Sequence, residues 1–470
     1  NSVSGNTVLG ESALDASVSG GNNTAIGHSS LSANTSGTNN VAIGANAAIL
    51  NTTGSNNVAI GKDTFDANTT GSSNVAIGTG ALGVATTADN NVAMGVFAMD
   101  ANTTGNSNTA VGRGSLGANT TASNNTAVGF NSLEANTTGA SNTAVGATAL
   151  DANTTGELNT AIGAEALTAN TTASQNVAVG RRALTVNTTG ANNTAVGTNA
   201  LQENTTGAGN VATGMNSLSN NTTGELNTGV GISSIGTNTT GSNNAALGTD
   251  SLRFNTTASN NTAIGHFALK FNTTGTENVA VGTNALDANT TANQNTAVGF
   301  EALTSCTTGI RNTALGRKAL GSITTGTQNV AVGTSALFNN TASNNIAIGH
   351  DCMVSNTTGT RNTAVGANAL DANTTADRNT AVGFNTLTTN TTGSYNTCIG
   401  DAALEANTEG HNNVGIGQAA LVANTTGDNN IAVGTFALDA NNGSDNTAVG
   451  YNSLTNASAD NNTALGREAG

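Results

Sequence analysis

Proline and tryptophan are absent from the 470 residues, tyrosine occurs twice, and charged residues make up only 8%. An ordinary globular domain is about one quarter charged. Asp and Glu outnumber Lys and Arg by 27 to 12, so the formal net charge is −15. Binding to nucleic acid requires a basic surface, which this balance argues against. No apolar run approaches the ~20 residues of a spanning helix, so we expect no membrane insertion.

A five-residue motif returns along almost the entire chain, as Asn125–Gly129, Asn142–Gly146 and Asn159–Gly163 show. Its final residue, here called the marker glycine, occurs 28 times between Gly10 and Gly466. Successive marker glycines are 17 residues apart in 24 cases and 16 residues apart in three. The repeat leaves no linker, so it predicts a single continuous domain over residues 1–470.

Each repeat places the same residue types at the same distances from the marker glycine. An Asn stands four residues before it in all 28 copies, and a Leu usually stands four residues after it. The residues between Asn and Gly alternate as β-branched, Ala and aliphatic, which is the two-residue period of a strand. We expect a strand of about five residues there, and a second short strand at the Ala/Ser-Leu pair. The alternation does not tell which strand face points inward.

Seventeen residues are too few for a helix, a strand and two turns, since helical repeats need about 33. We therefore predict an all-β fold, a parallel β-solenoid (a β-roll) of about 28 coils with 17 residues each. A lone coil cannot bury its apolar face, so neighbouring coils must stack, ~4.8 Å apart, with like residues over like.

The stacked positions are the candidate structural sites. An Asn side chain has donors and acceptors, so identical Asn residues in successive coils can bond as a continuous ladder. We assign the marker glycine to a positive φ or to close approach of a neighbouring backbone, and the Leu to the core. A ligand-binding row of amides is the less favoured alternative, because every repeat shares the position. In consecutive repeats this structural ladder comprises Asn125, Asn142, Asn159, Asn176, Gly129, Gly146, Gly163, Gly180, Leu133, Leu150 and Leu167.

No arrangement of residues indicates catalysis, so we expect no enzyme, no catalytic or metal-binding residue and no cofactor. Carboxylates recur five residues after the marker glycine but are neighbours only at Glu134 and Asp151, and we interpret them as a solvated edge. Cys306, Cys352 and Cys398 occupy different repeat positions, which favours small buried side chains over a disulfide framework. Asn-Thr-Thr occurs 18 times as a formal glycosylation sequon, yet its strict register favours a structural turn.

The Asn-Thr-Ala-Val-Gly motif with its following Ala-Leu pair resembles the head repeats of trimeric autotransporter adhesins (the YadA-like heads). Together with Asn-Thr-Thr-Gly, it resembles the repeats of phage tail fibres and bacterial surface fibres even more closely. The similarity covers residues 6–470. It implies a left-handed parallel β-roll, three chains side by side, and an adhesive or fibre-forming role with a host-surface or glycan receptor. The adhesin heads use a shorter repeat than this chain.

We therefore expect a structural, fibre-forming protein located outside the cell, on a cell surface or on a virion. It would form the shaft or head of an appendage, an adhesin or a phage tail fibre. The expected partner is a second copy of the chain, in a homotrimer or in an end-to-end filament, because open solenoid ends expose unpaired strand edges. The alternative is an ice-binding β-solenoid, against which the mixing of Thr with Val in the strands argues.

Overall fold

The structure, a computed structural model, describes residues 3–456 and 459–470 and is a parallel β-solenoid with one three-residue strand in each coil. The described residues contain no helix. The predicted fold class is therefore confirmed. The chain forms two compact units, Asn1–Thr240 and Gly241–Gly470. That residues 1–470 form a single domain stays a prediction.

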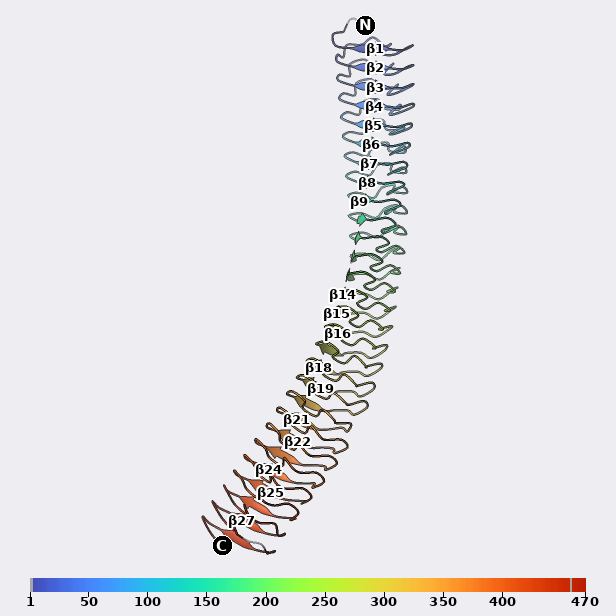
Figure 1. The fold of residues 1–470 in the computed structure, drawn as a ribbon. Coiled ribbons are helices and arrows are strands. Elements are labelled where there is room, and N and C mark those ends of the chain that lie inside the picture. The colour runs from blue at the N-terminus through green and yellow to red at the C-terminus, as the bar shows by residue number, and fades with distance from the viewer. Residues whose placement is uncertain (1–2, 457–458) are drawn as a thin grey trace. The chain divides into compact units, whose positions relative to one another are not determined.

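The first unit is a stack of coils whose strands follow one another in chain order (Figure 1). Its strands are β1 (Thr7–Leu9), β2 (Thr24–Ile26), β3 (Val41–Ile43), β4 (Val58–Ile60), β5 (Val75–Ile77), β6 (Val92–Met94), β7 (Thr109–Val111), β8 (Thr126–Val128), β9 (Thr143–Val145), β10 (Thr160–Ile162), β11 (Val177–Val179), β12 (Thr194–Val196), β13 (Val211–Thr213) and β14 (Thr228–Val230).

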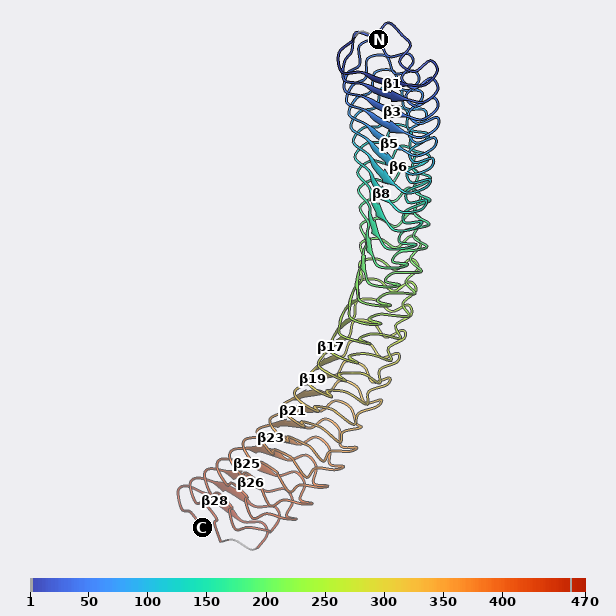
Figure 2. The same ribbon diagram turned by 45° about the horizontal axis from the view of Figure 1, so that its top comes forward.

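The second unit has the same plan, and in Figure 2 the strands labelled β17 to β28 lie along one side of its coils. Its strands are β15 (Ala245–Leu247), β16 (Thr262–Ile264), β17 (Val279–Val281), β18 (Thr296–Val298), β19 (Thr313–Leu315), β20 (Val330–Val332), β21 (Ile346–Ile348), β22 (Thr363–Val365), β23 (Thr380–Val382), β24 (Thr397–Ile399), β25 (Val414–Ile416), β26 (Ile431–Val433), β27 (Thr447–Val449) and β28 (Thr463–Leu465).

Within each unit, successive strands pair in parallel and in strict register. Thr126 of β8 lies beside Thr143 of β9, and Val128 lies beside Val145. A coil that is one residue shorter keeps this register, since Val330 of β20 still pairs with Ile346 of β21. Equivalent residues of successive coils therefore stack on each other, as the repeat predicts. The residue that the shorter coil lacks is one of the two Thr residues of the Asn-Thr-Thr turn.

The core of a coil is narrow and contains small or polar side chains together with Leu. In the coil of β8, Asn125, Ala127, Leu133 and Asn136 are all fully buried. The Ala of the strand faces this interior, while its β-branched neighbours Thr126 and Val128 remain partly exposed. The structure thus settles which strand face points inward: the small Asn-Ala face does.

The strands are shorter than expected, and the predicted second strand is absent from the described residues. β9 begins after Asn142 because the backbone N–H of Asn142 donates to a side-chain oxygen, Oδ1 of Asn125, instead of a backbone carbonyl. At the expected second strand, Asn131 and Leu133 have φ of 50° and 55°. A left-handed residue at every second position cannot belong to an extended strand, so this segment, here called the leucine turn, is not a strand.

Candidate interaction surface

Asparagines four residues before the marker glycine form a buried column along each unit, here called the strand-corner column. In the first unit, the backbone N–H groups of Asn142, Asn159 and Asn176 each donate to Oδ1 of the preceding Asn at 2.9–3.0 Å. Most of these links therefore join backbone to side chain. Bonds between two side-chain amides are fewer and longer, as from Asn159 Nδ2 to Asn142 Oδ1 at 3.2 Å.

A second buried column, the threonine-corner column, consists of the Asn residues that open Asn-Thr-Thr. Here the side-chain amides bond directly: Asn153 Nδ2 donates to Asn136 Oδ1, and Asn170 Nδ2 donates to Asn153 Oδ1, both at 2.9 Å. From the sequence, this Asn is interpreted as turn chemistry, and its replacement by Cys306 and Ile323 indicates a position that is at least partly buried. The burial is confirmed, since both replacements are fully buried, whereas the bonded column of amides was not predicted.

The two columns meet at one backbone carbonyl in most coils. The carbonyl of Gly139 accepts from Nδ2 of Asn125 at 3.0 Å and from Nδ2 of Asn136 at 2.9 Å. A carbonyl oxygen has two lone pairs, so this pair of bonds saturates it. Coils with both bonds are tied across their interior by buried polar groups with partners, which makes their cross-section rigid.

The marker glycines and leucines predicted as structural residues lie at equally constrained positions. Gly129 has a φ of 141°, and a Cβ there would lie 2.4 Å from the carbonyl oxygen of Gly146. Both proposed reasons for this glycine, the positive φ and the close backbone, apply together. The leucines four residues later, Leu133, Leu150 and Leu167, are fully buried. The remaining assigned glycines, Gly146, Gly163 and Gly180, share the positive φ of Gly129.

The outward side of the strands, here called the outer sheet face, consists of the first and third residues of every strand. These residues are Thr, Val, Ile, Leu, Met or Ala, and none of them is charged. Many remain open to solvent, such as Ile162 at 41% exposure and Val196 at 37%. Such an uncharged face contrasts with the other outward sides of the coils, which carry the charged residues.

The outer sheet face is a long uncharged surface in which apolar residues are mixed with Thr. Three residues span ~10 Å along the strand, and 14 strands at ~4.8 Å give ~65 Å, so the face of one unit covers roughly 650 Å². Contiguous apolar patches on monomeric proteins are typically limited to a few hundred Å², and larger ones mark interaction sites. This face is therefore the candidate interaction surface.

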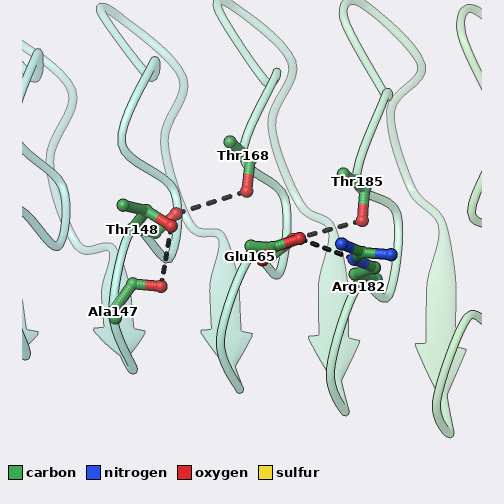
Figure 3. Close-up of polar contacts among 6 residues, drawn as sticks. All are labelled: Ala147, Thr148, Glu165, Thr168, Arg182 and Thr185. Atoms are coloured by element: carbon green, nitrogen blue, oxygen red, sulfur yellow. Dashed lines mark hydrogen bonds and ion pairs between the residues drawn. The ribbon is translucent and has the colours of Figure 1, made fainter.

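The leucine turn has its own polar contacts between coils, which Figure 3 shows. Thr168 Oγ1 donates to the carbonyl oxygen of Thr148 in the preceding coil at 3.3 Å, and Thr185 Oγ1 donates likewise to Glu165 at 3.2 Å. Arg182 Nε also donates to Oε2 of Glu165 at 2.6 Å. A threonine five residues after the marker glycine thus satisfies a carbonyl of the neighbouring coil.

Carboxylates at that same position are less solvated than the sequence suggested. Burial raises the pKa of Asp151, and the charge of Glu134 in the preceding coil raises it further. Burial also raises the pKa of Asp66, Asp100 and Asp371. The Oδ1 atoms of Asp151 and Asp371 are buried without a hydrogen-bond partner. The interpretation as a solvated edge is therefore wrong for these aspartates, which are half-buried, whereas Glu134 at the same position is exposed.

The three cysteines are buried and unpaired, as predicted. Burial raises the pKa of Cys306 to about 11 and that of Cys352 to about 12, so these thiols stay protonated near neutral pH. Within the described ranges, no three His, Cys, Asp or Glu side chains come together in a way that could hold a metal ion.

The Asn residues of the Asn-Thr-Thr sequons are closed to modification in the folded coil. Asn136 and Asn153 are fully buried. The Nδ2 group of Asn153 donates both to Asn136 Oδ1 and to the carbonyl of Gly156. A sugar on this nitrogen would remove a donor and could not fit, so the structural interpretation of the sequon accounts for its register.

No protein-family model matches this sequence, and no curated protein matches it either. In the part of the chain that the structure describes, no helix has the length and apolar character needed to cross a lipid bilayer. Each unit therefore presents one long uncharged face along its stacked coils.

Proposed function

We propose that this protein is a structural, fibre-forming β-solenoid whose copies associate side by side through the outer sheet face. The observation that supports the proposal is the absence of charge from that face: not one of the 28 strands places a charged residue at either outward position. In a chain with 39 charged residues, a solvated face would be expected to carry several of them. Leaving ~650 Å² of uncharged surface in water would promote aggregation, whereas burying it against a second copy stabilises the assembly.

The dimensions of the face suit a specific interface. Pairing this face from two copies buries roughly 1,300 Å² for each unit, which lies within the range of stable protein interfaces, about 1,200–2,000 Å². A homotrimer, in which three such faces meet around an axis, is the arrangement that the resemblance to adhesin heads implies. The function of the assembly is then length, stiffness and the repeated display of the charged corners, as the shaft or head of an extracellular appendage.

The test is the mass of the particle in solution together with images of it. Light scattering should give a multiple of 45.8 kDa for the natural chain, and electron microscopy should show uniform thin fibres. Val128→Lys combined with Val145→Lys places charges on the outer sheet face and should dissociate the particle. The matched control, Thr138→Lys with Thr155→Lys, charges the exposed threonine corner of the same coils and should leave the mass unchanged. An oligomer that survives the first pair of substitutions contradicts the proposed interface.

Ice binding is a second candidate, because the Thr residues of the outer sheet face repeat at the coil spacing, although Val interrupts their array. It requires the same face to be free in a monomer, so the two functions exclude each other. A 45.8 kDa monomer at all concentrations would contradict the fibre proposal. Faceted ice crystals that become round again with the Val128→Lys and Val145→Lys pair would then establish ice binding.

A further inference from the structure

A groove runs along the leucine turns of the first unit, away from the outer sheet face. One part of it is a hollow of about 510 Å³ that reaches from the coil of β3 to the coil of β6. Here it is called the acidic groove and is defined by Leu50, Asp63, Asp66, Val84, Phe97 and Asp100. All of these residues belong to one unit.

The groove exists because one coil has no side chains at its two groove-facing positions. Gly80 and Gly83 occupy the places where neighbouring coils carry Asp63 and Asp66. A Cβ on Gly80 would lie 2.7 Å from Cδ1 of Phe97, so the aromatic ring rests on this glycine. The missing side chain of Gly83 leaves the space between Asp66 and Asp100 open.

The walls of the groove are apolar and open to solvent. Leu50, Phe97 and Val84 are 51%, 49% and 46% exposed, and they project from three different coils. These exposures lie among the larger values for apolar residues in the described ranges. No contact within the coil stack requires such large side chains there, because glycine or polar residues occupy the same positions in other coils.

Two carboxylates in the groove lack a cationic partner among the described ion pairs. Asp63 accepts from Asn46 Nδ2 at 2.8 Å and lies 3.3 Å from Lys62 Nζ. Asp66 and Asp100 form none of the described ion pairs; their carboxylates accept only backbone N–H groups of their own turns, and partial burial raises the pKa of each. They stand two coils apart at the same position of the repeat, which places them ~9.6 Å from each other along the stack.

We propose that the acidic groove binds a linear organic dication, an α,ω-diamine or polyamine, with one ammonium group at Asp66 and another at Asp100. The methylene chain between the two ammonium groups would lie on Val84, whose coil stands between those of Asp66 and Asp100. The exposed ring face of Phe97 would add a cation–π contact. The two carboxylates favour a ligand with two positive charges. The apolar walls between them favour a hydrocarbon chain between those charges.

The neighbouring hollow provides an internal comparison. It has a volume of about 400 Å³, shares Phe97 and Asp100 with the acidic groove, and continues to Glu134. Arg113 lines it and supplies a positive charge of the protein's own. We therefore expect one diamine per chain, in the acidic groove, and not a second one beside Arg113.

The experiment is titration calorimetry of the full chain with 1,6-diaminohexane, in low-salt buffer at neutral pH. We expect saturable binding of one molecule per chain. Asp66→Asn and Asp100→Asn should each weaken it by about tenfold, the effect of losing one charged hydrogen-bonded contact. Hexylamine, which has one ammonium group, should bind about tenfold more weakly than the diamine. The matched control, Asp151→Asn, changes the same repeat position outside the groove and should leave the affinity unchanged.

Filling the groove provides an independent variant. A Cβ on Gly83 meets nothing closer than 3.4 Å, so Gly83→Leu fits the coil and occupies the hollow. It should abolish binding while the melting temperature stays close to that of the natural chain. The proposal fails if no saturable binding is measured, or if binding persists in Gly83→Leu or responds equally to Asp151→Asn. The particle mass is measured separately, so failure here leaves the side-by-side association standing.

Discussion

Each coil has two corners where an Asn is followed by a Gly, and only the threonine corner tolerates other residues at these positions. At the strand corner, Asn125 precedes Gly129, and both positions keep their residue in all 28 copies. At the threonine corner, Asn136 precedes Gly139, and the equivalent positions elsewhere carry Cys306, Ile323 or Ala122. Similar sequences therefore meet different physical demands.

The difference lies in which groups lose their partners when a residue changes. Oδ1 of a strand-corner Asn accepts the backbone N–H of the next Asn in the column, and no substitution of that Asn except proline removes this N–H. Oδ1 of a threonine-corner Asn accepts from another side chain, which can be exchanged together with it. A column whose partners are side chains can be interrupted. A column that caps backbone groups cannot be interrupted without leaving a buried N–H unpaired.

The largest contrast should appear at the glycines. Gly129→Ala places a Cβ 2.4 Å from the carbonyl oxygen of Gly146 at a φ of 141°, which only glycine adopts readily. We expect it to lower the free energy of unfolding by about 3 kcal/mol or more. A Cβ on Gly139 would also meet a backbone carbonyl oxygen, that of Gly156 at 2.3 Å, but Gly139 does not have a positive φ. Ala122 and Ala173 occupy the same position in nearby coils, so the backbone can shift to accept a Cβ there, and Gly139→Ala should cost less, about 1 kcal/mol. Urea denaturation of both variants measures the contrast, and equal losses would contradict it.

Substituting the asparagines should also destabilise the protein more at the strand corner than at the threonine corner, with smaller losses than for the glycines. Asn142→Ala leaves the buried N–H of Asn159 without its acceptor, so we expect a loss of about 2–3 kcal/mol. Asn153→Ala leaves only side-chain groups unpaired, since the carbonyl of Gly156 keeps its bond from Asn142, and should cost about 1–2 kcal/mol. Hydrogen exchange should accelerate at the Asn159 amide in the first variant alone. Comparable acceleration in the second would erase the distinction between the columns.

The natural gap in the threonine-corner column offers a repair experiment. Asn289 Oδ1 is buried without a partner, and the next two positions of its column are Cys306 and Ile323. Cys306→Asn alone should change stability little, because its own Oδ1 would then face Ile323. Combined with Ile323→Asn, it restores an unbroken column to Asn340, and the two substitutions should be coupled by about 1 kcal/mol. A double-mutant cycle by thermal denaturation measures the coupling, and simple additivity would contradict the ladder.

The smallest effect on stability is expected from the aspartates of the leucine turn, which lie outside both corners. Burial raises the pKa of Asp151 above the ~3.9 of an unfolded aspartate. The contribution of Asp151 to the free energy of unfolding is therefore most favourable at pH values below its pKa in the unfolded chain. This contribution is lost as the pH rises through the pKa of Asp151 in the folded chain. Asp66, Asp100, Asp287 and Asp371 shift in the same direction. We expect the melting temperature to rise as the pH falls from 7 towards 4.

The substitution Asp151→Thr tests the origin of this pH dependence. By analogy with Thr168, the new hydroxyl should donate to the carbonyl of Asn131 in the preceding coil and add about 1 kcal/mol at pH 7. It should also flatten the rise of the melting temperature towards acid. Glu157→Gln removes an exposed charge at the threonine corner and serves as the control for general repulsion in an acidic chain. An identical pH profile for both variants would assign the effect to net charge.

The sequence predicted the coil, its length and the stacking, because a fixed period with one strand motif leaves no other arrangement. It could not tell which strand face points inward, since alternation with a period of two fits either. Packing decides this: Gly415 stands where most coils have the strand Ala, and a Cβ there would lie 2.6 Å from Leu404 Cδ1. In β2 to β28 this inward position holds only Ala, Gly or Cys398, so it accepts small side chains.

The remaining differences have local causes that residue types do not reveal. Leu133 adopts a left-handed conformation, which is unfavourable for Leu in isolation and is maintained by burial and by its N–H bond to the carbonyl of Ala149. The acidic groove depends on Gly80 and Gly83 lying in one coil beside Phe97 of the next. Only the stacking register brings these residues together, so no motif in the linear sequence marks the groove.

Stacking of like residues over like in coils of 17 residues is the claim on which both corners depend, and a cysteine pair tests it most directly. Thr138 and Thr155 are exposed at the threonine corners of adjacent coils, and Thr172 is two coils from Thr138. Neighbouring coils place equivalent Cα atoms ~4.8 Å apart, within disulfide range, whereas two coils give ~9.6 Å. Under mild oxidation, Thr138→Cys with Thr155→Cys should form an intramolecular disulfide, and Thr138→Cys with Thr172→Cys should not. A disulfide in the second variant and none in the first would contradict the stacked coil.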